Sequence, residues 1–463
     1  MKKFLSFFAF AALMLAGCDP IDEPEPQPVD PGTDPVTPVD PTPTDPTPPP
    51  VTLYDVIIQL VADGANFTVP GVNVVFEDAS GVTSYEAATD DNGAAAFKVP
   101  AGSYSASATY KTAEDGKRVA FNGSNSSITV SEAATFQVSL NKVVSQQVII
   151  KELYSFGCGK NDTGNYSDDA YVILYNNSDI EADASDIVFS LILPANGNAA
   201  NKYIKDGALM YESLGWVPAY SAIWWFTSEV KIPAYSQIVV AIFGAIDHTQ
   251  TVSASVDLSK PEYYWMSNTE IASVFKNAKY KVSDSISKDH YLNAYPISAG
   301  NAWVISNQSP AFYIGKMAQA EAEALSKDAD NYDKTATLTV AKFPQDKVVD
   351  AVEVWSAANI EKSNYRFPAS INTGYVALTN NLGHTVYRNV DKEATEALPE
   401  NAGKLVYNYS GGSYDAATQK GSTDPSGIDA EASIANGAHI IYSDTNDSGK
   451  DFHERLVASL KRR

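Results

Sequence analysis

Cysteine and histidine are scarce in this chain of 463 residues, which holds two cysteines and five histidines. Two cysteines cannot build a disulfide framework, so we expect the fold to be stabilised by packing. The histidines are scattered and no His-Glu-x-x-His pair occurs, which argues against a multi-histidine metal site. No Gly-x-Ser-x-Gly elbow occurs either, so no motif indicates nucleophilic catalysis. We therefore expect a protein that is not an enzyme and needs no metal or other cofactor.

Positive charge is also in deficit. The chain carries 33 Lys and Arg residues against 56 Asp and Glu residues, a formal net charge of -23. Such a surface repels phosphate backbones and anionic membrane surfaces. We expect no nucleic-acid partner.

The hydrophobic run at the N-terminus, from Phe4 to Leu15, is too short to span a bilayer. It follows Lys2 and Lys3 and ends in small residues, the pattern of a cleaved secretory signal. Residues 1–17 are therefore predicted to be a signal peptide. Its removal takes away two lysines and leaves 31 basic against 56 acidic residues, a net charge of -25.

The tetrapeptide Leu15-Ala16-Gly17-Cys18 resembles the bacterial lipobox. This resemblance implies cleavage before Cys18, acylation of its thiol and amine, and anchoring by several lipid chains, each buried methylene adding about 0.8 kcal/mol. The acidic residues that follow at once resemble the export signal of Bacteroidota surface lipoproteins, and they are Asp19, Asp22, Glu23 and Glu25. An ordinary secretory signal with a chance cysteine is the alternative.

Residues 18–50 form the lipidated cysteine and a tether dominated by Pro, Asp and Thr. Proline fixes φ and removes hydrogen-bond donors, so this segment should run as an extended polyproline II spacer. At about 3.1 Å per residue it could hold the next domain up to roughly 100 Å from the lipid.

From Leu53 onward, short apolar runs alternate with polar residues and are separated by turn signals, as in Asp91-Asn92-Gly93. About seven such strands in 90 residues predict a β-sandwich. Residues 51–142 resemble the carboxypeptidase-regulatory (transthyretin-like) domain, on the segments 69–74, 89–93 and 99–104. The resemblance implies an Ig-like or transthyretin-like sandwich that acts as a spacer or docking module without catalysis.

Residues 146–463 resemble a longer, lamin-tail-like (Ig-like) β-sandwich. The segments that carry this resemblance are 148–153, 170–178, 232–241, 303–307 and 348–355. The fold class we expect is therefore mainly β, with residues 200–230 and 250–340 as insertions. Helices are predicted within these insertions at 271–279, after a capping box at Ser267–Glu270, and at 316–327, and an exposed loop is predicted at 410–433.

The two modules together resemble an uncharacterised family of Bacteroidota lipoproteins that comes with no established activity. Asp247-His248-Thr249 and the segment 444–448 fit recurring features of that family.

Aromatic residues are concentrated in the expected insertions and could form a stacking platform for a ligand. The predicted ligand-binding residues are Trp216, Trp225, Tyr263, Trp265, Asp247 and His248. Core packing is the alternative, favoured for Trp224 and Phe226 and equally plausible for Trp216 and Trp265. Asp247 and His248 could form half of a catalytic pair, but a contact that orders their loop is favoured because no motif supplies a nucleophile.

Two further features allow alternative interpretations. The loop Asp444–Gly449 begins like a calcium loop, but its twelfth position is Arg455 instead of a bidentate Glu, so a solvated turn is favoured over calcium binding. Cys158 is interpreted as a small buried hydrophobe, with a reactive or intermolecular thiol as the alternative.

These observations predict a surface-exposed outer-membrane lipoprotein that acts as a ligand-capture or docking module. Its expected partners are the outer membrane, through the lipid, and a TonB-dependent transporter, while the ligand would be a glycan, a peptide or a small planar molecule. An adhesin or structural surface protein is the alternative function, and a hydrolase with an unrecognised site is a weaker one.

Overall fold

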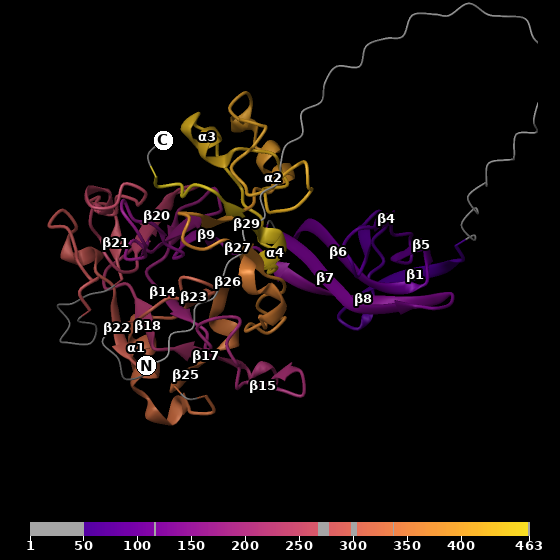
Figure 1. Ribbon diagram of the computed structural model, residues 1–463, viewed down its shortest axis with the longest axis horizontal. Helices are drawn as coiled ribbons and strands as arrows, with labels where there is room; N and C mark the ends of the chain where they lie inside the picture. Colours follow the sequence, from indigo (N-terminus) through magenta and orange to yellow (C-terminus); the bar gives the residue numbers. More distant parts are fainter. Residues whose placement is uncertain (1–50, 115–116, 267–276, 298–302, 337, 462–463) are drawn as a thin grey trace, which may run out of the picture. The chain divides into compact units, whose positions relative to one another are not determined.

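The computed structural model describes residues 51–461 apart from 115–116, 267–276, 298–302 and 337 (Figure 1). The predicted signal peptide, Cys18, the tether, the capping box Ser267–Glu270 and most of the predicted helix 271–279 lie outside the described residues. Residues from Thr52 onward belong to one compact unit. No helix of the described part is long and apolar enough to cross a membrane. The expectation of a mainly β fold is confirmed.

The first eight strands form one sheet, whose last strand ends two residues beyond the predicted segment 51–142. Its strands are β1 (Leu53–Ala62), β2 (Ala65–Asn66), β3 (Asn73–Asp78), β4 (Ser84–Ala88), β5 (Ala94–Pro100), β6 (Gly102–Glu114), β7 (Lys117–Val130) and β8 (Ala134–Val144). Their order is β2-β1-β8-β7-β6-β3-β4, and β5 pairs with β1. Strand β8 pairs in parallel with β1 and then in antiparallel with β7, so it joins the two halves.

The predicted turn at Asp91-Asn92-Gly93 is confirmed. The Asp90 carboxylate accepts hydrogen bonds from the amides of Asn92 and Ala94, both at 2.9 Å. Gly93 adopts φ +75°, and a Cβ there would lie 2.0 Å from the Phe67 carbonyl oxygen. The position therefore requires glycine.

Two six-stranded sheets form the framework of the rest of the chain. Sheet I has the order β21-β20-β12-β9-β28-β29, and its strands are β21 (Tyr264–Trp265), β20 (Gln237–Ala241), β12 (Tyr171–Asn176), β9 (Val148–Tyr154), β28 (Thr385–Arg388) and β29 (Phe452–Arg455). Sheet II has the order β22-β18-β14-β23-β26-β27, and its strands are β22 (Asn293–Pro296), β18 (Ala222–Trp225), β14 (Ile187–Leu191), β23 (Ala311–Lys316), β26 (Val348–Ser356) and β27 (Val376–Leu378).

Smaller elements cover these sheets. A three-stranded sheet contains β17 (Trp216–Tyr220), β25 (Val340–Pro344) and β24 (Tyr332–Asp333). Short pairs join β10 (Cys158–Gly159) to β11 (Asn165–Tyr166), β13 (Ala182–Asp183) to β19 (Lys231–Ile232), and β15 (Ile204–Lys205) to β16 (Ala208–Leu209). The α-helices are α1 (Gln319–Lys327), α2 (Lys392–Glu396), α3 (Ala430–Ala435) and α4 (Ser448–Asp451). Single 3₁₀ turns lie at Glu212–Leu214, His248–Gln250, Lys288–His290, Ala329–Asn331, Gln345–Lys347, Ala357–Lys362 and Pro399–Asn401.

Sheet II is covered on both faces. Phe189 and Trp224 pack into an inner core shared with sheet I, whereas their neighbours Val188 and Trp225 pack into an outer core shared with β17 and β25. Successive side chains of a strand point to opposite faces, so a strand between two cores must be apolar throughout. This explains why β14 and β18 are buried along their whole length.

Several expectations for this part need correction. Strand β18 and strand β23 come from the segments predicted to be insertions, yet both lie inside sheet II. Residues 303–307 form no strand, although Trp303 is buried in the inner core. The predicted exposed loop 410–433 is exposed only in its first half, because Asp424, Ser426 and Ser433 are buried. The predicted helix 316–327 is confirmed as α1.

The two-core arrangement predicts that Trp224→Ala and Trp225→Ala are both severely destabilising. Each ring is at most 2% exposed and fills a different core, so each substitution should cost about 3–5 kcal/mol of unfolding free energy. The half-buried Trp216 is the control, and Trp216→Ala should cost less. Urea denaturation followed by circular dichroism measures all three, and a loss below about 1 kcal/mol for Trp225→Ala would contradict the outer core.

Candidate functional site

The aromatic residues predicted to bind a ligand are mostly in the core. Trp225, Tyr263 and Trp265 are 2%, 5% and 1% exposed. The Trp265 indole nitrogen donates to the Phe243 carbonyl oxygen at 2.7 Å. Trp216 is half-buried and packs edge-on against Tyr203. The burial of the first three rings contradicts an exposed stacking platform, because their faces are already used in packing.

Asp247 and His248 do not act as a pair. The Asp247 carboxylate accepts a hydrogen bond from the Thr249 amide at 3.0 Å and caps a 3₁₀ turn. The His248 ring is buried, with Nδ1 2.6 Å from the Tyr166 hydroxyl and Nε2 2.9 Å from the Gly244 carbonyl oxygen. Both side chains therefore order their loop, as predicted. They do so through separate contacts and not through a contact with each other.

Cys158 is buried, as predicted. Its Sγ lies 3.8 Å from Oδ2 of Asp169. Burial, together with the nearby Asp169 charge, raises the pKa of the thiol to about 11. The thiol is therefore protonated at neutral pH and a poor nucleophile.

The Asp444–Gly449 segment is not the solvated turn that the sequence favoured, because Asp444, Thr445 and Ser448 are buried. Asp444 turns toward the Arg388 guanidinium, as does Asp451, while Asp447 accepts a hydrogen bond from the Gly449 amide at the start of α4. No group of three His, Cys, Asp or Glu side chains in the described ranges is arranged to hold a metal ion.

Arg388, on β28, is fully buried at the centre of this cluster. Its Nη2 donates to Asp350, its Nε donates to the Ile150 carbonyl oxygen at 2.6 Å, and its Nη1 donates to the Ser443 carbonyl oxygen at 2.8 Å. Nη1 also lies 3.6 Å from Oδ1 of Asp444. The guanidinium therefore connects both six-stranded sheets to the C-terminal segment.

The cluster holds more negative than positive charge, since the carboxylates of Asp350, Asp444 and Asp451 surround one guanidinium. Burial, followed by the negative charge of Asp350, raises the pKa of Asp444 to about 7. Oδ2 of Asp444 accepts a hydrogen bond from the Gln146 amide at 2.8 Å. Its Oδ1 is buried and accepts none. A buried oxygen without a donor carries a desolvation cost, which adds to the raised pKa of this carboxyl.

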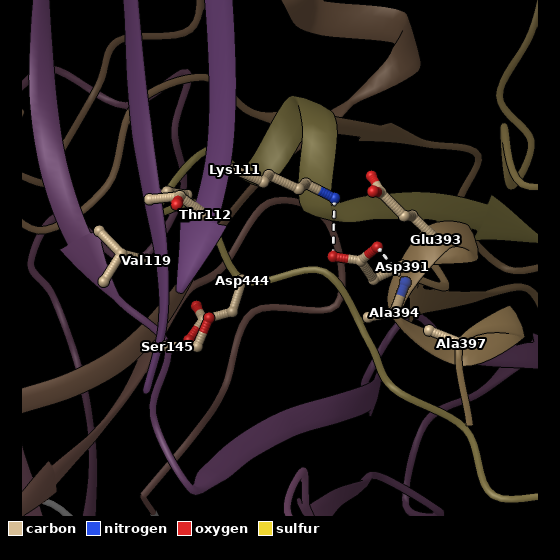
Figure 2. Close-up of a pocket in the computed structure, with 10 residues that line it drawn as sticks. Lys111, Thr112, Val119, Ser145, Asp391, Glu393, Ala394, Ala397 and Asp444 are labelled. Atoms are coloured by element: carbon tan, nitrogen blue, oxygen red, sulfur yellow. Dashed lines mark hydrogen bonds and ion pairs between the residues drawn. The ribbon is translucent and has the colours of Figure 1, made fainter. Parts of the chain in front are cut away.

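A pocket of about 300 Å³ adjoins this carboxylate (Figure 2). The residues that line it come from β6, β7, the segment before β9, α2 with its cap, and the segment before α4, and they are Lys111, Thr112, Val119, Ala120, Ser145, Asp391, Glu393, Ala394, Ala397 and Asp444. Figure 2 shows the ion pair between Lys111 Nζ and Asp391 Oδ2, which measures 2.9 Å. The three carboxylates outnumber the single ammonium, and the remaining lining is largely apolar.

Sequence reasoning missed this pocket because its residues lie in segments as far apart as Lys111 and Asp444. One signal was visible: Asp391 precedes a short helix as an N-cap residue, and its carboxylate accepts a hydrogen bond from the Ala394 amide at 3.2 Å. That signal locates a helix start but does not indicate a ligand.

The raised pKa of Asp444 predicts a pH-dependent contribution to stability. The folded state keeps its proton up to pH about 7, whereas the unfolded state releases it near pH 4, so stability falls as pH rises between these values. Relative to an Asp444→Asn variant, the free energy of unfolding of the wild-type protein should fall by at most about 1.4 kcal/mol per pH unit in this window. Urea denaturation of both proteins from pH 4 to pH 8 measures this fall. If the wild-type value minus the variant value stays constant or increases with pH, the assignment of the raised pKa to Asp444 is contradicted.

Comparison with known proteins gives a family match without an activity. Residues 235–414 match the family described as a protein of unknown function, DUF4876. No curated protein matches the chain significantly. A solved DUF4876 family protein from Bacteroides thetaiotaomicron is 18% identical, with 88% of this chain and 96% of that chain covered and a TM-score of 0.49.

Two solved DUF3823 family proteins are more distant. The protein from Parabacteroides merdae is 7% identical, with 65% of this chain and 98% of that chain covered and a TM-score of 0.15. The protein from Bacteroides ovatus is 9% identical, with the same coverage and a TM-score of 0.14. Neither a carboxypeptidase-regulatory nor a lamin-tail domain is confirmed by these matches. Over residues 235–414 the chain is thus similar to an uncharacterised family that is found in Bacteroidota.

Proposed function

We propose that this protein is a surface-anchored binding protein that captures a small ligand with a cationic group on a partly apolar body. The observation that carries the proposal is the Figure 2 pocket, where the carboxylates of Asp391, Glu393 and Asp444 outnumber the single ammonium of Lys111. An ammonium or guanidinium group would balance this excess of negative charge. It would also lie near the carboxylates that surround Arg388.

The pocket lining supports this ligand class. Asp391 is neutralised by Lys111, which leaves Glu393 and Asp444 as the carboxylates without an ion pair to a lysine. Val119, Ala120 and Ala397 add apolar surface to the same lining. Small-molecule sites commonly combine such a wall with a few convergent polar groups, in volumes from about 300 Å³ upward.

The location of the protein is proposed from its sequence. The lipobox-like ending at Cys18 and the acidic residues after it support anchoring in the outer membrane with the chain at the cell surface. A lipid anchor holds the protein in the same membrane as outer-membrane transporters and so raises the effective concentration of one for the other. A TonB-dependent transporter is therefore the partner we propose for the captured ligand.

The charge of the ligand can be tested with benzylammonium and the similarly sized neutral benzyl alcohol. At pH 8, where Asp444 is largely ionised, benzylammonium should bind at least about tenfold more tightly, since only the cation interacts favourably with Glu393 and Asp444. Glu393→Gln should weaken its binding by about threefold, measured by isothermal titration calorimetry. The matched control is Glu323→Gln on α1, which should bind as the wild type does. Equal affinity for the amine and the alcohol would contradict a cation site.

The lipid anchor can be tested independently with Cys18→Ser. The wild-type protein should enter the detergent phase in a Triton X-114 partition, and the variant should remain in the aqueous phase because it lacks the acyl chains. Cys158→Ser is the control and should partition as the wild type does, because that thiol is buried. Detergent partitioning of the Cys18→Ser variant would exclude the proposed anchor.

A further inference from the structure

Arg455 is a buried arginine at the end of β29, with 3% of its surface exposed. Its guanidinium carbon lies 4.7 Å from the ring centroid of Tyr387 and 5.7 Å from that of Tyr409. These two rings hold the guanidinium by cation–π contacts, which leave its hydrogen-bonding edges free.

These edges form few hydrogen bonds. Nε donates to the Val457 carbonyl oxygen at 3.0 Å, but Nη1 is buried and donates to nothing. Nη2 makes no hydrogen bond in the described part of the chain and, unlike Nη1, is not closed off from solvent. A guanidinium has five N–H donors, so most of its capacity is unsatisfied.

The other two fully buried arginines each have a carboxylate counter-ion. Arg366 is paired with Glu353 and Arg388 with Asp350, each through a direct ion pair. Arg455 has no carboxylate within ion-pair distance among the described residues. Because a buried charge without a counter-ion is unfavourable, this exception indicates that the counter-ion comes from outside the described residues.

A pocket of about 230 Å³ lies next to Arg455. Its walls are formed by one side of α3, with Glu431 and Ala432, and by the segment after β29, with Val457, Ser459 and Lys461. It shares no lining residue with the Asp444 pocket. The two pockets can therefore be occupied and tested separately.

The local charge is positive although the chain as a whole is strongly acidic. Glu431 is neutralised by Lys151, whose Nζ lies 2.7 Å away, and it accepts a hydrogen bond from the Tyr387 hydroxyl. Glu152 is fully buried and accepts hydrogen bonds from the Tyr171 hydroxyl at 2.7 Å and from the Ser459 amide at 3.0 Å. Glu152 and Glu431 attract Arg455 only at longer range than an ion pair. Arg455 and Lys461 are the cationic side chains of the lining, and neither forms an ion pair with a described residue.

We infer that the pocket between α3 and the segment after β29 binds a compact oxyanion, a carboxylate or a phosphate, through Nη2 of Arg455, with Lys461 at its rim. A planar guanidinium matches the geometry of both anions. Ala432, Ala435 and Val457 add apolar side chains to the lining, and the burial of Arg455 at 3% exposure strengthens a charge-assisted hydrogen bond to its guanidinium. This site is independent of the proposed cation pocket.

The test is the binding of sodium acetate and of sodium phosphate to the full mature chain, each compared with sodium chloride at constant ionic strength. Constant ionic strength is needed because added salt alone stabilises a chain with this net charge by screening. Calorimetry and the unfolding temperature should both report binding of at least one of the two oxyanions, with stabilisation that grows with its concentration. Preference for one of them identifies the anion class.

Two variants assign the site. Arg455→Lys keeps the charge but loses the planar fork, and it should weaken binding by about tenfold. Lys461→Glu changes a partly exposed side chain and should weaken binding by about threefold to tenfold without unfolding the protein. Lys205→Glu, at an exposed position on β15, is the matched control and should bind as the wild type does.

Absence of any effect of acetate and phosphate beyond that of chloride would overturn the proposal. Equal losses for Lys461→Glu and Lys205→Glu would also overturn it, because they would show a general effect of net charge. Unchanged affinity in Arg455→Lys together with Lys461→Glu would assign the anion to another site.

Discussion

The buried Arg388 guanidinium is the interaction on which the second half of the molecule depends. It reaches Asp350 on sheet II and the Ile150 carbonyl oxygen on sheet I, while Oδ2 of Asp350 accepts a hydrogen bond from the Ile150 amide at 2.7 Å. The same guanidinium approaches Asp444 and so fixes the segment that forms one wall of the pocket. Removing one partner of such a network leaves a buried charge, at a cost of about 3–5 kcal/mol. The position of the proposed ligand site therefore depends on the packing of the sheets.

Strand patterns predicted much of the framework from the sequence. The runs that became β9, β12 and β26 are apolar and bounded by turn residues, which are local signals. The same local signals did not predict the strand that lies between the inner core and the outer core. Core packing was favoured for Trp224, but Trp225 was predicted to bind a ligand. Trp225 fills the outer core instead, because a sheet that covers the other face of sheet II is encoded far away at β25.

Sequence patterns could not predict the candidate sites, because these sites also depend on contacts between distant segments. Asp444, Lys111 and Glu393 meet only through the packing of distant segments, and no spacing rule links them. The segment beginning at Asp444 was predicted to be a solvated turn, whereas Asp444 is buried beside Arg388. Arg455 stood out in the sequence only as the residue that excludes an EF-hand, whereas its lack of a carboxylate partner is visible only in three dimensions.

Native mass spectrometry of the full lipidated chain tests the proposed cation pocket most directly. The protein would be exposed to an equimolar mixture of small amines and neutral alcohols of matched size. A cation pocket should give a one-to-one adduct with an amine, and the double variant Glu393→Gln, Asp444→Asn should lose it. Equal occupancy by amines and alcohols, or an amine adduct that survives in the double variant, would contradict a cation pocket.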